Sequence, residues 1–216
     1  MKYVLPIAGV VLVFLGIWFF LKKDSSNSTL TENQSSPTPQ ATRMNTLTTQ
    51  PPKEVFFEPV EGFRERITKK PFGISITPEN SPIQPERFRG FHTGADSEFE
   101  DVEGDVVVRA VAGGTIVLAR RVSGYGGVVV IEHLYQNKKI FALYGHLDPK
   151  SIPPINTTVT QGQQIGILGD GGTEETDGER KHLHFGVLNK DEVDLRGYVP
   201  EENELVGWMN PLDLYR

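Results

Sequence analysis

The sequence has 216 residues, enough for one medium-sized domain and an appended segment, with a net charge of −6 at pH 7 and no cysteine. Because the charge is negative and no basic stripe is present, we expect no nucleic-acid binding. The lack of cysteine excludes disulfide scaffolds, thiolate zinc sites and cysteine nucleophiles, and it fits an oxidising location outside the cytoplasm.

The first 23 residues predict a membrane anchor. Residues 3–21 read YVLPIAGVVLVFLGIWFFL without a charge, and a helix of that length spans roughly 28 Å, close to the thickness of a bilayer core. A cleaved signal peptide is the alternative, but its apolar region is normally shorter and ends in small residues. Here the run ends in IWFFLKK, so residues 1–23 are interpreted as an uncleaved transmembrane helix.

Residues 24–54 predict a flexible linker. They are rich in Ser, Thr, Asn, Gln and Pro, a composition that buries too little apolar surface to offset the entropy of ordering. The lysines at the two ends of the apolar run do not fix the orientation of the anchor, which must be inferred from function.

Residues 55–216 predict one all-β domain. Short β-prone runs alternate with Gly-rich or Asn-rich turns at intervals typical of antiparallel sheets, and no sustained helical periodicity appears. We expect helices to be short and peripheral, and strands to lie within 105–111, 114–122, 126–134, 138–147, 163–169 and 182–188.

The segment HLHF contains two of the five histidines, His182 and His184. Side chains alternate along a strand, so both imidazoles should lie on one face while Leu183 and Phe185 lie on the other. The arrangement suits two groups that share one ion or one reacting centre, although two solvent-facing histidines on an edge strand remain an alternative.

The segment GFHTGADSEF places His92 four residues before Asp96. We expect Gly94 to permit a sharp turn that brings both side chains to one point. Two histidines and a carboxylate are a usual zinc ligand set that leaves a fourth position open. A loop in which the carboxylate only caps a turn is the alternative.

The segment ALYGHL ends a predicted strand at His146. Alternation places Ala142, Tyr144 and His146 on one face, and an ordinary strand end is the alternative. Tyr144 either lines a groove or has an ordinary packing or surface role. The fifth histidine, His133, is interpreted as structural or exposed. Arg89 is a second candidate for the groove wall.

Together, His-x-x-x-Asp, Tyr-Gly-His-Leu and His-Leu-His-Phe resemble the lysostaphin-type zinc metallopeptidases, the M23 or LytM family. AVAGGTIV, GYGGVVVIEH, VTQGQQIGILGDGGT and NPLDLY also resemble the framework of that family. The resemblance covers roughly residues 88–215. It implies an antiparallel β-sheet domain of lysostaphin or LytM type with a groove along the sheet.

The resemblance also implies the roles of five residues. His92, Asp96 and His184 would bind one Zn²⁺ ion, and His146 and His182 would flank the water that attacks the substrate. The implied reaction is hydrolysis of peptide bonds in the cross-links or bridges of peptidoglycan. The alternative is a catalytically silent domain that binds the wall or an unknown regulatory partner and controls another hydrolase.

Elementary chemistry agrees with these roles. Zinc with an open position lowers the pKa of its water to about 7, and imidazole, which titrates near 6.5, can take up the proton and return it to the leaving amine. His146 is the first choice as general base, with His182 as its assistant or as an oxyanion stabiliser, and the sequence does not decide between them. A wall hydrolase would be a single-pass protein of the cell (inner) membrane with its catalytic domain outside the cytoplasm.

One segment departs from the pattern of the family, and the role of a second segment is undecided. TEETDGERK, residues 173–181, replaces the usual Gly-rich turn before His182, and its acidic side chains either select a basic substrate residue or are merely solvated. The entrance Arg180-Lys181 is unusual. Residues 55–87 either lie across the domain or cover its groove.

Overall fold

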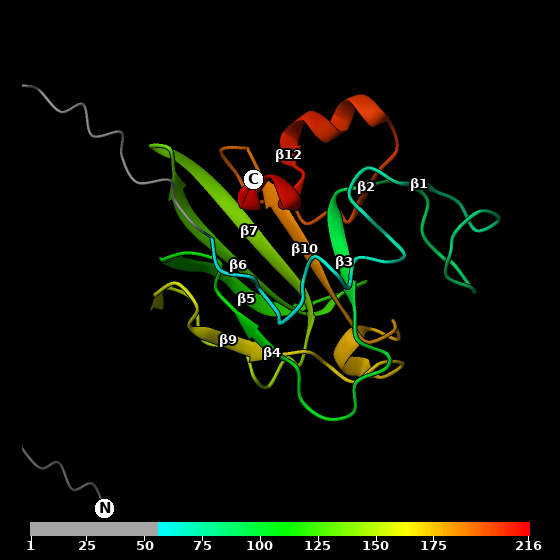
Figure 1. The fold of residues 1–216 in the computed structure, drawn as a ribbon, viewed down its shortest axis with the longest axis horizontal. Helices are drawn as coiled ribbons and strands as arrows, with labels where there is room; N and C mark the ends of the chain where they lie inside the picture. The colour runs from blue at the N-terminus through cyan, green and yellow to red at the C-terminus, as the bar shows by residue number, and fades with distance from the viewer. Residues whose placement is uncertain (1–55) are drawn as a thin grey trace, which may run out of the picture. The chain divides into compact units, whose positions relative to one another are not determined.

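The computed structural model of the protein describes residues 56–216 (Figure 1). The predicted anchor (1–23) and linker (24–54) lie outside the described residues. Among residues 56–216, no helix is long and apolar enough to cross a membrane.

The largest sheet has seven strands, and every pairing within it is antiparallel. Its long strands lie side by side in Figure 1, with β3 against one edge of β10. The path runs β12-β10-β7-β6-β5-β8, where β12 is Trp208–Met209, β10 is His182–Leu188, β7 is Lys138–Leu147, β6 is Gly126–Tyr135, β5 is Gly114–Val122 and β8 is Thr158–Val159, while β3 is Gly94–Glu98.

Two small sheets and three short 3₁₀ helices complete the described residues. One sheet has the order β1-β2-β11, formed by Ser75–Ile76, Gly90–His92 and Tyr198–Val199, and the other pairs β4 (Val107–Arg109) with β9 (Gln164–Ile167). The helices are η1 (Glu174–Thr176), η2 (Glu202–Gly207) and η3 (Pro211–Tyr215). All six predicted strand segments contain a strand, and the prediction of short helices is confirmed.

Both faces of the large sheet are covered, as β6 illustrates. Val129 and Ile131 pack into one apolar cluster, while Val128 and Val130 pack into a second cluster on the other face. Since each face buries its own set of branched side chains, this strand is apolar at successive positions rather than alternating with polar ones. The first cluster is the larger, and the functional residues lie on the side of the second.

The segment around Asp96 is a strand, so the predicted turn at Gly94 is wrong. His92 ends β2, and Asp96 lies in the middle of β3, with Thr93 alone between the two strands. Gly94 serves another purpose: a Cβ atom there would lie 2.7 Å from the carbonyl oxygen of Phe185 and 2.8 Å from the His184 ring. The glycine therefore lets β3 approach β10 closely.

The prediction that His146 shares a face with Tyr144 is also wrong, because a bulge interrupts β7. The register with β6 shifts between Gly127 and Val128, and His146 has a φ of 64°, in the left-handed region. Tyr144 consequently stays in the larger core cluster, where its hydroxyl oxygen accepts a hydrogen bond from the Val111 N–H at 3.0 Å. His146 instead turns to the opposite side of the sheet.

Candidate metal centre and active site

The central position of β10 brings the histidine pair to the other candidate residues. His184 lies directly opposite Asp96 of β3 on one side and Gly145 of β7 on the other. Leu183 and Phe185 point into the larger core cluster, so the prediction that the two imidazoles share the other face is confirmed. The apolar residues hold the strand, and the histidines are left for chemistry.

Three atoms converge on one point: Nε2 of His92, Oδ1 of Asp96 and Nδ1 of His184. The two nitrogens are 3.0 Å apart, and the Asp96 oxygen is 3.2 Å from His92 and 3.1 Å from His184. Tetrahedral ligands on bonds of about 2.0–2.2 Å would lie about 3.3–3.5 Å apart. The triangle therefore has nearly the size that one zinc ion requires.

The outward nitrogens of the two rings support this fit. His92 Nδ1 lies 3.2 Å from the carbonyl oxygen of Pro71, which can only accept, so this nitrogen carries the proton. His184 Nε2 lies 3.4 Å from the hydroxyl of Tyr125. With the protons on these outward atoms, lone pairs of both rings and a carboxylate oxygen face each other, which is an arrangement that a cation completes.

Burial and charge set the ionisation of this triangle. His92, Asp96 and His184 are all almost fully buried. Burial alone would raise the pKa of Asp96, but the neighbouring His92 and His182, together with the His184 ring 3.1 Å away, hold that pKa well below its usual range. Burial lowers the pKa of His184. At neutral pH Asp96 is therefore a carboxylate and His184 a neutral imidazole, the forms that bind metals.

His146 and His182 lie next to each other beside the triangle, with ring centroids 4.1 Å apart. Each Nδ1 faces a backbone carbonyl oxygen, that of Thr176 at 3.3 Å and that of Arg180 at 2.8 Å, so each Nδ1 donates and each Nε2 keeps its lone pair. Burial lowers the pKa of His146 to about 3 and that of His182 well below its usual value. Both rings are neutral proton acceptors at pH 7.

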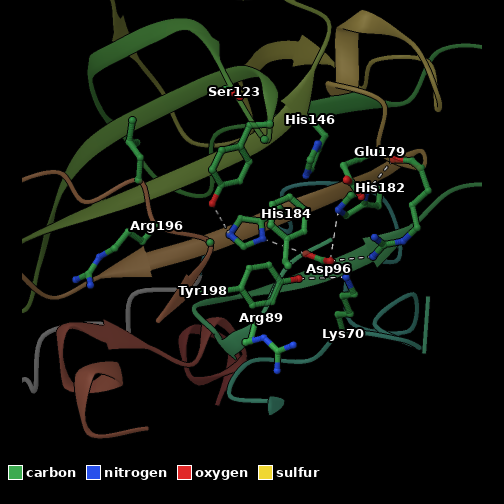
Figure 2. A pocket seen from close by; sticks show the side chains of 16 residues that line it. Lys70, Arg89, Asp96, Ser123, His146, Glu179, His182, His184, Arg196 and Tyr198 are labelled. Carbon is green, nitrogen blue, oxygen red and sulfur yellow. Dashed lines mark hydrogen bonds and ion pairs between the residues drawn. The ribbon is translucent and has the colours of Figure 1, made fainter. Parts of the chain in front are cut away.

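These residues line one pocket of about 310 Å³, shown in Figure 2. Asp96, His146, His182 and His184 all contribute to its wall, and the other lining residues include Lys70, Phe88, Arg89, Tyr125, Glu179, Arg180, Arg196 and Tyr198. Arg89 is at the pocket as expected. Tyr144 is not, because the bulge leaves it in the core.

Residues 56–87 do not cover the pocket. Among them, Lys70 alone lines its wall. Lys70 is buried and forms an ion pair of 2.5 Å with Glu86, and its ammonium also donates to the Tyr198 hydroxyl at 3.2 Å. Phe88 stacks on Tyr198 with ring centroids 5.4 Å apart. This segment therefore builds a side wall of the pocket and supports His92 through Tyr198, whose ring lies 5.1 Å from that imidazole.

The acidic loop before His182 is largely engaged within the chain. Arg87 binds Glu179 at 2.8 Å and the backbone oxygen of Asp177 at 2.9 Å. The Asp177 carboxylate also accepts from the Gly124 N–H at 2.8 Å. Glu179 and Asp177 therefore fasten the loop to its neighbours, so these two side chains are neither merely solvated nor free to select a substrate residue.

Tyr125 is a site residue that the sequence did not reveal. It is buried against the rings of His146 and His184, and burial raises the pKa of its hydroxyl, which stays protonated. Gly145 makes room for it, since a Cβ atom there would lie 2.5 Å from the Tyr125 ring. An aromatic residue enclosed by glycines in SGYGG was the available signal.

His133 lies outside the pocket, as its interpretation as a structural residue requires. It is 2% exposed, and its Nδ1 donates to the carbonyl oxygen of Gly113 at 2.9 Å. Its Nε2 is buried without a hydrogen-bond partner.

Comparison with known proteins agrees with this geometry. Residues 90–195 match the family model of peptidase family M23. This range contains all five candidate residues, so the match to peptidase family M23 is a match of this domain, residues 90–195. It is a domain of the class to which peptidoglycan hydrolases belong, and its candidate zinc ligands are His92, Asp96 and His184.

Individual relatives show how far the likeness extends. The murein hydrolase activator EnvC of Escherichia coli strain K12 is 34% identical over 101 residues, which are 47% of this chain and 20% of EnvC. The chain thus spans about a fifth of the length of that relative.

Comparison with solved structures gives matches of low identity. The SpoIIQ–SpoIIIAH pore-forming complex contains a chain with 23% identity and a TM-score of 0.49, covering 75% of this chain and 91% of that one. Csd3 of Helicobacter pylori has 23% identity and a TM-score of 0.43, covering 68% of this chain and 35% of that one.

Proposed function

We propose that the protein is a zinc metalloendopeptidase that hydrolyses peptide bonds of peptidoglycan cross-links or bridges. One observation carries the proposal: a buried triangle of two imidazole nitrogens and a carboxylate oxygen, 3.0–3.2 Å apart, lies beside a second pair of imidazoles that line the same pocket as Asp96 and His184. The match of residues 90–195 to peptidase family M23 supports a peptide as the substrate.

His92, Asp96 and His184 would hold the ion. When bound, zinc would polarise the scissile carbonyl and make water a stronger nucleophile at neutral pH. His146 Nε2, fixed as an acceptor by the bond of its Nδ1 to Thr176, would take a proton from the attacking water and return it to the leaving amine. His182, held in the same way by the Arg180 carbonyl, would stand beside it and stabilise the charge that develops.

Digestion of purified peptidoglycan tests the proposal. The wild-type chain should release fragments with new amino groups, because a peptide bond is broken, and should leave glycan bonds intact. His184→Ala should abolish the release. Intact peptidoglycan after treatment with the zinc-loaded wild-type chain would reject the enzymatic function.

A catalytically silent role is the second candidate, and the likeness to EnvC favours it, since that relative is described as a murein hydrolase activator. In this case the domain would bind the wall or a protein partner and stimulate another hydrolase. Adding the His184→Ala chain to a second purified wall hydrolase separates the two. Stimulation of that hydrolase by a chain that does not itself cleave the wall supports the regulator. No stimulation of that hydrolase supports the enzyme.

The location is part of the proposal. If the substrate is the cell wall, residues 1–23 would anchor the chain in the cell membrane as a single pass, and residues 24–54 would carry the domain on the outer side. By random-coil scaling the linker would reach on the order of 30 Å. Protease added to intact spheroplasts should remove the domain, whereas full protection would contradict this topology.

A further inference from the structure

Arg180, at the unusual entrance to β10, lies against a candidate metal ligand. It stands two residues before His182, and its side chain is only 7% exposed. Its guanidinium donates two hydrogen bonds to Glu98, at 2.8 Å and 2.7 Å, and one to Oδ2 of Asp96 at 2.8 Å. One planar fork therefore joins two buried carboxylates.

The strand register explains why these groups meet. Asp96 and Glu98 are two residues apart in β3, so their side chains lie on the same face. Across the sheet, Glu98 is opposite His182. Two carboxylates on one buried face would repel each other, and the guanidinium between them removes that repulsion.

The two oxygens of Asp96 have separate partners. Oδ1 faces His92 and His184, at 3.2 Å and 3.1 Å. Oδ2 is bound by Arg180 at 2.8 Å and lies 3.4 Å from His182 Nε2. A carboxylate that is held through one oxygen can offer only the other to an ion, and partners of this kind orient metal ligands.

We propose that the Arg180–Glu98 pair positions the Asp96 carboxylate so that it binds a metal ion through Oδ1 alone. The proposal rests on the assignment of Asp96 as a ligand in the proposed function. Arg180 is a positioning residue, because it acts through Asp96. Glu98 fixes the guanidinium and offsets its charge next to the cation.

Zinc affinity of the full chain, measured by competition with a chromophoric chelator, tests the proposal. Arg180→Met should weaken zinc binding about 10- to 100-fold, the usual effect of losing a partner of a metal ligand. Arg180→Lys should also weaken it, because an ammonium keeps the charge but cannot bridge both carboxylates in a fork. Unchanged or tighter binding in these variants would overturn the proposal, since the guanidinium would then be idle or would compete with the ion.

Cobalt substitution gives a second readout that does not depend on activity. If Arg180 no longer holds Oδ2, Asp96 can bind through both oxygens, and the higher coordination number weakens the visible absorption of Co²⁺. We expect a weaker band in Arg180→Met than in the wild-type chain. Identical spectra would overturn the proposal.

Two further variants guard against a loss of folding. Arg180→Met/Glu98→Met replaces the buried pair with apolar side chains, a change that is often neutral for stability, and should still weaken zinc binding. Arg196→Met is the matched control: this arginine also lines the pocket, but it pairs with Asp194 and Glu204 and should leave zinc affinity unchanged. If the wild-type chain binds no zinc, both the positioning role and the proposed function fail. If the wild-type chain binds zinc and the Arg180 variants bind it with the same affinity, only the positioning role fails.

Discussion

The two pairs of imidazoles differ in what their unprotonated ring nitrogens face. His92 and His184 direct their lone pairs at Asp96, whereas His146 and His182 donate from Nδ1 to backbone oxygens and keep Nε2 for the pocket. In the proposed mechanism, the place of His146 and His182 next to each other beside the metal triangle assigns them to proton transfer. The left-handed conformation of His146 is the strained feature that allows this placement.

We predict that His146→Gln keeps stoichiometric zinc but lowers the turnover of peptidoglycan about 10²- to 10⁴-fold, the usual contribution of a general base. Glutamine fills similar space but does not accept a proton. Metal content and cleavage rate should be measured on the same preparation. A variant that retains wild-type turnover would remove His146 from the mechanism.

His133 predicts a pH dependence of stability. Burial lowers its pKa, so the folded state disfavours the protonated ring. Below the ordinary pKa of about 6.5, the imidazole is protonated in the unfolded chain but stays neutral in the folded chain. The free energy of unfolding therefore decreases progressively as the pH falls.

The thermal midpoint of His133→Leu should therefore fall less between pH 7.5 and pH 5.5 than that of the wild-type chain. The comparison isolates His133, because the other buried histidines are present in both proteins. Parallel decreases would show that His133 does not contribute.

At the scale of elements, the sequence predicts the strands that form the cores, including β7 and β10, and misses the short strands β2 and β3 that carry His92 and Asp96. The six long β-prone runs are recognisable because each buries branched side chains on at least one face. β3 reads GADSE and has no such pattern, although all five of its residues are buried. Its polar side chains are buried because they bind partners on other strands. The hydrophobic periodicity of the sequence does not reveal such burial.

The bulge at His146 has the same origin. Strict alternation predicts that Tyr144 and His146 share a face, and a single extra residue reverses this. The glycine that precedes His146 gives only a general hint of irregular backbone. Face assignments near a strand end are therefore less secure than the existence of the strand.

Gly94→Ala tests the close contact of β3 and β10. The added Cβ atom would lie 2.7 Å from the carbonyl oxygen of Phe185, so the strands must separate. We expect a loss of about 1–3 kcal/mol in the free energy of unfolding, measured by chemical denaturation, with weaker zinc binding.

Gly113→Ala is the matched control. A Cβ atom there would lie 3.7 Å from the carbonyl oxygen of Val159, an ordinary contact, and the change should be within about 0.5 kcal/mol. Equal stability of the two variants would show that the space between β3 and β10 can accommodate a methyl group.

At the scale of the whole domain, residues 56–89 are part of the site rather than a cover over it. Lys70 and Glu86 join this segment to Tyr198, which contacts His92. The sequence left open whether the segment crosses the groove, because its contacts join residues more than a hundred positions apart.

Glu86→Leu should lower the free energy of unfolding by about 3–5 kcal/mol, because it leaves the Lys70 ammonium buried without its carboxylate. Lys70→Met/Glu86→Leu should recover most of the loss, since no unpaired charge remains. The two values come from the same denaturation series. A single variant as stable as the wild-type chain would mean that the pair is not essential to this wall.

The five candidate residues could be named from sequence because three short motifs occur in one order. Four of them line one pocket, and the fifth, His92, is buried 3.0 Å from His184. The surrounding residues could not be named. Tyr125, Lys70 and Arg180 reach the pocket through pairings across the sheet and through buried ion pairs, which depend on the finished fold.

The most direct test of the central claim is a zinc titration of the metal-free full chain, followed by cleavage of purified peptidoglycan. Cleavage should be absent without metal and should rise to a plateau at about one zinc per chain. Asp96→Ala should remain inactive throughout the same titration. Cleavage that is independent of zinc, or no cleavage at any zinc concentration, would contradict the assignment of His92, Asp96 and His184 as the metal centre of a peptidase.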